Sequence, residues 1–510
     1  MIGWRREAMH LDWQVCSQAR LTRDPRFDGK FFIGVVGSGV YCRSICPAPT
    51  AKEKNVRYFP SAAAAAEAGF RPCLRCRPES SPGTPAWMGT SNTVARALRL
   101  IDESGLEDGV EGLGERLGVG ARHLRRLFLK HLGATPMAVE HTRRLHFAKK
   151  LIDETTLPMN QIALASGFGC VRRFNASIRK VYHRTPTQIR NLARWTEIQP
   201  DQQYLFRLHF RPPYHWQAML DFLAARATPG VELVEGGSYR RSISRNGREG
   251  YFEASLDPGR DALLVRIAFG DPPSLFFIVE KVRAMFDLNA DWSAIVQSLR
   301  SDPVLTAGVA AEPGVRVPGC WNGFELAVRA ILGQQITVQG ATTMAGRLAR
   351  SFGKAFSGVA GLTHLFPEPE VLAEAPLGNI GLTGARVETI RALARAACSG
   401  RINFEGVVDT EALLARLCEI PGIGKWTAQY VAMRALGEPD AFPSSDLGLL
   451  RAAELETARD LELHAEAWRP WRAYAAMYLW RGAGTRDSKL TYQSAKVSRR
   501  AEEQRSSIFA

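Results

Sequence analysis

Four cysteines near the start of the 510-residue chain carry the strongest chemical signal: the Cys42/Cys46 pair and the Cys73/Cys76 pair. The short spacing within each pair, and the length of the segment between the pairs, allow four thiolates to converge on one zinc ion. Such a centre carries excess negative charge, which the neighbouring arginines at positions 43, 71, 75 and 77 would offset. The pattern therefore predicts a zinc centre, either structural or with a reactive thiolate.

Spacing alone leaves these two roles open, since a site with four cysteine ligands is more often structural than reactive. The segments YCRSIC and AGFRPCLRC, within residues 10–78, resemble the N-terminal domain of the bacterial adaptive-response proteins of the Ada type. That resemblance implies that Cys42 accepts a methyl group from methylphosphotriesters in DNA. It also implies that Cys46, Cys73 and Cys76 are the other zinc ligands.

The chemistry explains why a metal-bound thiolate would be used. A methylphosphotriester is a weak methyl donor, so the nucleophile must be a full thiolate at neutral pH, and zinc keeps the sulfur deprotonated. Transfer is irreversible and removes one negative charge from a surface that faces DNA phosphates. We therefore expect methylation of Cys42 to raise DNA affinity, as a damage-triggered switch.

Composition places the chain among proteins of several packed domains. Hydrophobic residues make up 45%, without a continuous run long enough for a membrane span. Residues 1–200 hold 31 Lys and Arg against 17 Asp and Glu, whereas the remainder holds 35 against 34. This asymmetry predicts a polyanionic partner for the first part. Nine cysteines, four of them grouped, and no signal-peptide pattern predict a reducing cytoplasm. The resemblance to Ada proteins implies that this is the cytoplasm of a bacterium.

Two segments after the cysteine region have the pattern of a helix-turn-helix, with a glycine-containing turn between two helices. In GLGERLGVGARHLRRLFLKHLG a glycine-bearing turn at 118–120 separates two helices, and a weaker echo has its turn at 167–169. Each unit alone is equally well explained as a helical hairpin with a solvated basic face. The tandem pair, with a Thr-Pro step closing each unit, resembles the double helix-turn-helix domain of AraC-type activators. The residues expected to contact DNA are Arg122, Arg125, Arg126, Arg172 and Arg173.

A second group of candidate functional residues begins in the segment LCEIPGIGKWTAQY at 417–430. Gly422 and Gly424 predict a tight turn with unobstructed backbone amides, followed by the positive end of a new helix, which suits a DNA phosphate. Asp446 follows in a short Pro/Ser-rich loop before another helix. Glycine turns between helices are common, so the interpretation of this turn as a DNA-binding hairpin depends mainly on the nearby Asp446.

Residues 203–485 resemble the helix-hairpin-helix base-excision glycosylases, in detail the AlkA type, 3-methyladenine DNA glycosylase II. The segments VRAILGQQI, PGIGKWTAQY and WRPWRAYAAMYLW carry the resemblance. It implies a catalytic role for Asp446 and a pocket for the flipped base, with Gln335 filling the space that the base leaves in the duplex. Ordinary core packing is the alternative for the three aromatic residues expected to line this pocket. Those residues are Trp426, Tyr430 and Trp480.

Two absences narrow the predicted reaction. Relatives that also cut the DNA strand carry a Schiff-base lysine where this chain has Trp426, and Lys425 lies on another side of the helix. No cysteine follows Cys418, so the iron–sulfur cluster of the endonuclease relatives is not expected. The chain also has no segment resembling the guanine methyltransferase site that ends many Ada proteins. A monofunctional glycosylase is favoured.

The predicted fold class is multidomain α+β and mostly α. We expect a zinc-bound α/β domain at 1–88, a double helix-turn-helix at 89–195, an α/β subdomain at 203–310, a helix-hairpin-helix domain at 311–487 and a disordered tail at 488–510. The expected cofactor is Zn2+. The expected partners are alkylated and promoter DNA and RNA polymerase, with a monomer favoured and no membrane. The alternative is a transcriptional activator whose glycosylase-like half only binds DNA.

Overall fold

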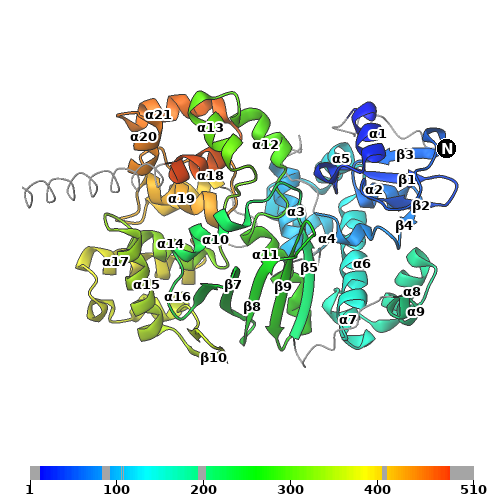
Figure 1. Ribbon diagram of the computed structural model, residues 1–510. Coiled ribbons are helices and arrows are strands. Elements are labelled where there is room, and N and C mark those ends of the chain that lie inside the picture. Colours follow the sequence, from blue (N-terminus) through cyan, green and yellow to red (C-terminus); the bar gives the residue numbers. More distant parts are fainter. Residues whose placement is uncertain are drawn as a thin grey trace, which may run out of the picture.

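The computed structural model describes residues 12–82, 92–104, 106, 108–192, 203–404 and 410–482. Helices predominate, with a small sheet at the N-terminal end, a larger sheet at the centre and a helical region beyond it (Figure 1). The predicted fold class is therefore confirmed. The predicted tail at 488–510 lies outside the described residues.

Among the described helices, none combines the length and the apolar character needed to cross a membrane.

The N-terminal domain places the two cysteine pairs beside each other. β2 (Val40–Cys42) ends at a cysteine, and β4 (Arg71–Pro72) leads directly into Cys73. These strands are parallel, with Tyr41 opposite Pro72, so both cysteines leave the same end of the sheet. The sheet has the order β3-β1-β2-β4. The other elements are α1 (Trp13–Thr22), β1 (Phe32–Val35), β3 (Val56–Phe59) and α2 (Ala62–Glu67).

Between residues 92 and 192, the described residues form seven helices, which contain both predicted helix-turn-helix units. In the first unit Gly118 has φ +68°, and a Cβ on Gly114 would lie 2.6 Å from the carbonyl oxygen of Val119, so glycine permits the tight turn. In the second unit the turn follows α7, with Gly167 at φ +74°. The helices are α3 (Asn92–Ser104), α4 (Gly109–Leu117), α5 (Ala121–Leu132), α6 (Pro136–Glu154), α7 (Met159–Ala165), α8 (Val171–Tyr182) and α9 (Pro186–Leu192).

The central sheet is antiparallel, with the order β5-β9-β8-β7-β6. The segments YLFRLHF, GYFEASL and ALLVRIAF predict β5, β8 and β9, and residues 214–226 and 274–287 predict the two helices. Strands β6 and β7 were not predicted, and the segment SYRRSISR of β7 looks polar. The structure explains this polarity, since Arg241 of β7 is buried and donates to Glu325 at 2.6 Å. The elements are β5 (Gln203–His209), α10 (Trp216–Ala224), β6 (Glu232–Glu235), β7 (Ser238–Arg245), β8 (Arg248–Leu256), β9 (Ala262–Phe269) and α11 (Leu275–Met285).

The rest of the described chain is helical, apart from a two-stranded ribbon of β10 (Ala355–Val359) and β11 (Leu362–His364). The chain is again helical at 472–482. The helices are α12 (Trp292–Leu299), α13 (Pro303–Ala311), α14 (Gly323–Leu332), α15 (Val338–Phe352), α16 (Pro369–Glu374), α17 (Gly384–Cys398), α18 (Thr410–Cys418), α19 (Lys425–Ala435), α20 (Leu447–Ala453) and α21 (Ala458–Ala465).

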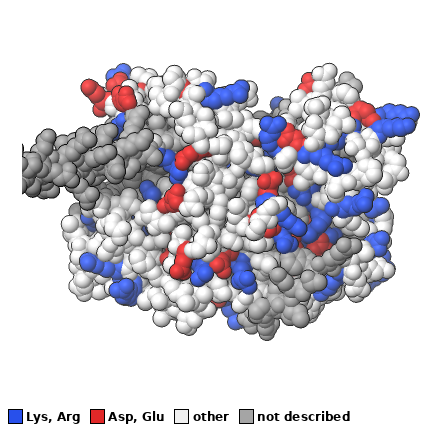
Figure 2. Space-filling model, viewed as in Figure 1, with Lys and Arg blue, Asp and Glu red and all other residues white. Residues whose placement is uncertain are grey.

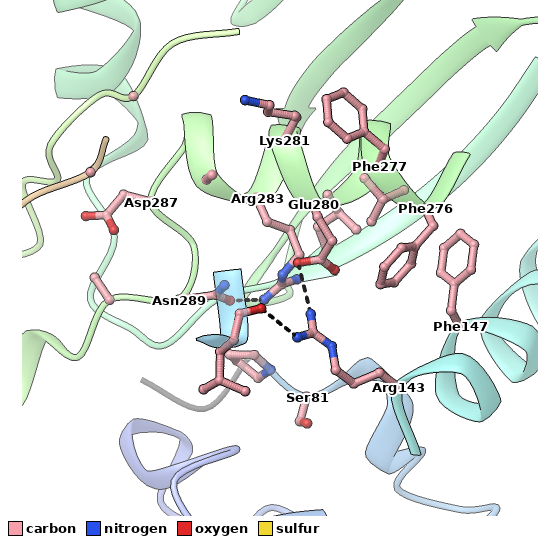
Figure 3. A pocket seen from close by; sticks show the side chains of 18 of the residues that line it. Ser81, Arg143, Phe147, Phe276, Phe277, Glu280, Lys281, Arg283, Asp287 and Asn289 are labelled. Atoms are coloured by element: carbon pink, nitrogen blue, oxygen red, sulfur yellow. Dashed lines mark hydrogen bonds and ion pairs between the residues drawn. The ribbon is translucent and has the colours of Figure 1, made fainter. Parts of the chain in front are cut away.

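One hydrophobic core joins the second helix-turn-helix unit to the central sheet. Phe147 of α6 meets Phe276 of α11 with ring centroids 4.8 Å apart, and Arg143 approaches Glu280 at 3.9 Å beside them (Figure 3). The same buried cluster runs from Leu145 to Leu288 and beyond, across the predicted boundary near 196–203. The activator-like and glycosylase-like parts therefore share this core, although each also has a core of its own.

Candidate functional site

The four predicted zinc ligands come together. The sulfur atoms of Cys42, Cys46, Cys73 and Cys76 all lie within 4.8 Å of one another. Four sulfurs around one tetrahedral zinc would be about 3.8 Å apart, given Zn–S bonds of about 2.3 Å, so small shifts suffice to close the site. Three of the four are buried, and Cys46 is the more accessible one.

The donor set fits a divalent cation on chemical grounds. Hydrogen bonding among the sulfurs raises the pKa of Cys42 and Cys76 and lowers the pKa of Cys46 and Cys73. The shifts diverge because four thiolates so close together cannot all carry charge without a cation among them. Bound Zn2+ would provide that charge and keep every sulfur ionised.

A buried arginine lies beside this cluster. The Arg43 guanidinium donates to the Cys76 carbonyl oxygen at 3.1 Å and forms a bidentate ion pair with Asp28, and both side chains are buried. Its own backbone amide lies 3.4 Å from the Cys76 sulfur. Arg77, which sequence analysis grouped with Arg43, is turned instead to Glu154 on α6, at 3.0 Å.

The second predicted site forms around Asp446, the residue that caps the N-terminus of α20. Its Oδ1 accepts from the Leu449 backbone amide at 3.0 Å and from the Trp480 indole Nε1 at 2.9 Å. Its Oδ2 accepts from the Trp426 indole Nε1 at 2.9 Å. Three donors from three elements thus fix the carboxylate. A carboxylate has about four acceptor positions, so Oδ2 keeps room for another group.

The three predicted pocket aromatics meet at this carboxylate. Trp426 and Tyr430 stack with centroids 5.3 Å apart and ring planes 6° from parallel, and Tyr430 lies edge-on to Trp480 at 6.3 Å. All three are partly exposed, whereas Tyr474 and Tyr478 on the final helix are buried. Simple core packing does not account for this difference. The exposed aromatic faces suit a flat ring.

The predicted hairpin connects α18 and α19. Gly422 has φ +92°, and a Cβ there would lie 2.2 Å from Thr389 Oγ1, which donates to the Pro421 carbonyl oxygen at 2.9 Å. Gly424 caps α19, and a Cβ there would meet only open space. Within the described ranges, no acceptor contacts the amide nitrogen of either glycine. The two amides are therefore available to a ligand at the positive end of α19.

Gln335 lies in the exposed loop between α14 and α15. Its φ is +57°, a conformation in which residues other than glycine are strained. The adjacent Gln334, which sequence analysis did not select, donates to the Gly422 carbonyl oxygen at 2.9 Å and to Thr427 Oγ1 at 3.0 Å. Gln334 thus ties the loop with Gln335 to the glycine hairpin.

The residues behind Tyr430 were not predicted from the sequence. Arg434 donates to the Tyr430 hydroxyl at 2.7 Å, and Arg226 stacks on Phe222 of α10 at 3.9 Å. Burial favours a raised pKa for Tyr430, but the charges of Arg434 and Arg226 outweigh it, and the pKa is lowered. No local pattern marks these residues, because α10 lies about two hundred positions before the hairpin.

The five predicted DNA-contacting arginines are all exposed, on α5 and on α8. Arg125 pairs with the exposed Glu111 at 3.0 Å, and Arg126 contacts His123 at 3.0 Å. On the face shown in Figure 2, Lys and Arg gather over the N-terminal part on the right. These positions are compatible with contact to a polyanion.

Comparison with known proteins agrees with a chain that has an activator-like part and a glycosylase-like part. A protein of Mycobacterium tuberculosis described as a probable bifunctional transcriptional activator/DNA repair enzyme AlkA is 40% identical over 481 residues, which cover 92% of this chain and 97% of that protein. The chain belongs to this family. Members of the family join an activator and a repair enzyme in one polypeptide, as the described halves suggest.

Each half also has relatives of its own. DNA-3-methyladenine glycosylase 2 of Escherichia coli is 34% identical over 279 residues, 54% of this chain and 96% of that protein. The bifunctional transcriptional activator/DNA repair enzyme Ada of the same organism is 35% identical over 127 residues, 25% of this chain and 35% of that protein. Three family models match: the metal binding domain of Ada at 15–79, a helix-turn-helix domain at 113–192 and the AlkA N-terminal domain at 205–322. The predicted resemblances are confirmed.

Proposed function

We propose that this AlkA-family protein repairs alkylated DNA at two sites, by excising alkylated purines at Asp446 and by taking methyl groups onto Cys42. The observation that carries the proposal is the carboxylate of Asp446, fixed by three N–H donors at the edge of an aromatic wall. An N3- or N7-alkylated purine is already cationic, so it needs little acid assistance to leave. Electron-rich aromatic faces favour such a ring.

In the excision reaction the bond between C1′ and the base nitrogen breaks, and its electron pair leaves with the base. The sugar then develops oxocarbenium character, which the Asp446 carboxylate stabilises through Oδ2 until water adds to C1′ and loses a proton. The Gly422 and Gly424 amides would hold a phosphate near the lesion. Trp426 occupies the position of the Schiff-base lysine, so strand cleavage is not part of the reaction.

At the zinc site the Cys42 sulfur attacks the methyl carbon of a phosphotriester. A sulfur–carbon bond forms, the carbon–oxygen bond breaks, and the electron pair stays on the phosphate oxygen as a phosphodiester anion. Cys46, Cys73 and Cys76 would complete the zinc site, whose metal keeps the sulfurs ionised. Cys46 is more exposed than Cys42, so the acceptor needs direct mapping. Trypsin cleaves after Arg43 and separates the two cysteines, and a methyl group on the Cys42 peptide is expected.

Arg122, Arg125 and Arg126 of α5, with Arg172 and Arg173 of α8, would contact promoter DNA. RNA polymerase would be the partner for activation, and a bacterial cytoplasm the setting. Gln335, on its exposed and strained loop, would enter the space that the flipped base leaves.

The test of excision is Asp446→Asn in the full chain, because the two halves share a core and the isolated glycosylase half would expose it. Loss of the negative charge is expected to slow single-turnover release of 3-methyladenine by roughly a hundredfold or more. Affinity for damaged duplex should stay within about threefold, and the exposed Glu462→Gln serves as the matched control. Release at the unmodified rate would favour a half that only binds DNA.

A further inference from the structure

Buried charged groups connect the zinc domain directly to the glycosylase half. Lys30 lies in the turn that leads into β1, and Asp291 is the capping residue of α12. Their side chains form an ion pair at 2.6 Å, and each is only 3% exposed. An ion pair that deep is strongly destabilised when one partner is lost, because the other charge stays buried. The contact therefore depends on both halves being docked.

A second connection lies next to this pair. Arg211, in the segment that follows β5, is 1% exposed and donates to the Asp28 carbonyl oxygen at 2.8 Å and to the Asn289 carbonyl oxygen at 2.6 Å. Gly29 has φ +73°, and a Cβ there would lie 2.2 Å from the Pro82 carbonyl oxygen and 3.1 Å from Arg211 Nη2. Glycine at 29 therefore permits the close approach of Pro82 and of the Arg211 guanidinium to this turn. Arg211 thus bridges the zinc domain and the glycosylase half through backbone carbonyls of both.

The same residues reach the cysteine cluster. Asp28, whose carbonyl oxygen accepts from Arg211, holds the Arg43 guanidinium with its carboxylate. Arg43 in turn donates to the Cys76 carbonyl oxygen. We call the set Lys30, Asp291, Arg211, Asp28 and Arg43 the interdomain clamp. It gathers three cations and two carboxylates beside a centre whose four thiolates around Zn2+ would carry two negative charges.

The glycosylase side of the clamp borders open space. Asp287, Asn289 and Ala290 line a cavity of about 430 Å³ between the zinc domain, α6 and α11. Figure 3 shows Asn289 at this cavity, where its Oδ1 accepts from Arg283. A segment with a cavity on one side can move without displacing a packed core. It can therefore respond when the clamp weakens.

We propose that the glycosylase half is the docking partner of the zinc domain, and that methyl transfer to Cys42 loosens the interdomain clamp. This rests on the proposed function, in which Cys42 takes the methyl group. The transfer forms a sulfur–carbon bond, leaves the broken bond's electrons on the phosphate, and halves the negative charge of the zinc centre. The attraction that holds Arg43 and its neighbours weakens in that low-dielectric site. Repair of the phosphate backbone is thereby coupled to the excising half.

Hydrogen exchange in the full zinc-loaded chain tests this, before and after reaction with DNA that carries methylphosphotriesters. Amide exchange at 287–292 should rise at least about fivefold on methylation, while β8 stays unchanged as the internal control. Intact mass and the Cys42 peptide report the methyl group separately. Unchanged exchange in fully methylated protein overturns the coupling but leaves the proposed function standing. A Cys42 that takes no methyl group overturns both.

Variants test the docking contact without methylation. Lys30→Met should raise exchange at 287–292 in the unmodified chain, and methylation should then add little, since both changes act on one contact. Asp291→Asn, which keeps the helix cap and lies far from the cysteines in sequence, should do the same with full zinc content. Lys354→Met, which alters a 71% exposed lysine paired with Glu249, is the matched control. If neither clamp variant raises exchange there, the clamp does not hold the halves together.

Discussion

The cysteine cluster and the site around Asp446 are built in opposite ways. The four cysteines lie between positions 42 and 76, and two paired strands bring them together. Asp446 is instead held by Trp426 and Trp480 from separate helices, and α10 supports Tyr430 from a distant part of the chain. A site made of one short segment depends on its ligands above all. A site assembled from several elements depends on many contacts, each of modest weight.

This difference predicts an all-or-none response at the first site, which Cys73→Ala should show most strongly. Structural zinc contributes on the order of 10 kcal/mol to the folding of such small modules. The variant should lose its zinc, as measured by elemental analysis, and its protection from exchange in β1 and β2. Cys418→Ala, at an exposed cysteine outside the cluster, should keep both. Full zinc content in Cys73→Ala would contradict the four-ligand centre.

At the assembled site we expect graded losses. Trp426→Phe keeps a ring against Tyr430 but removes the donor to Asp446 Oδ2. A hydrogen bond to a charged group is worth about 1.5–3 kcal/mol, so single-turnover release should fall roughly ten- to a hundredfold. Trp480→Phe should behave alike, and Trp13→Phe, an exposed tryptophan of the N-terminal domain, should have no effect. A loss in either tryptophan variant that exceeds the loss in Asp446→Asn would mean that the site is not graded.

The glycine hairpin separates binding from folding. In Gly424→Val the new side chain would extend into open space, so the fold should tolerate it. The same side chain would obstruct the hairpin amides, so both damaged and undamaged DNA should bind roughly tenfold more weakly. Gly422→Ala should instead lower the free energy of unfolding by about 1–2 kcal/mol or more, because φ is positive and Thr389 stands in the way. Fluorescence titration and thermal unfolding measure the two effects. Equal stability of both variants would remove the distinction.

The smallest expected effect is the change in DNA affinity caused by the loss of one negative charge at the cysteine cluster. Methylation of Cys42 should strengthen binding of the full chain to undamaged duplex by a few-fold at low salt, roughly the effect of one charge near phosphates, and the gain should fade as salt rises. Titration of methylated and unmethylated protein at two ionic strengths measures this. Equal affinities at low salt would leave the proposed switch without a physical basis.

Much of the fold followed from local patterns. Both helix-turn-helix units, strands β5, β8 and β9, and the hairpin between α18 and α19 were predicted from periodicity and glycine placement. β7 was not, because its buried Arg241 is compensated by Glu325 from a helix far along the chain. The ribbon of β10 and β11 was missed as well, since its strands are largely exposed. An apolar pattern identifies a buried strand only where the strand holds no buried charged residue that pairs with a distant partner.

The sequence by itself determined the zinc ligands, the hairpin glycines and Asp446, because each is marked by residue type and spacing within a short segment. Only the tertiary structure decided which groups orient Asp446, that Arg434 and Arg226 stand behind Tyr430, and that Lys30 and Arg211 join the two halves. These contacts join positions far apart in the chain. Their energies arise from burial, which no short segment can specify before the whole chain has folded.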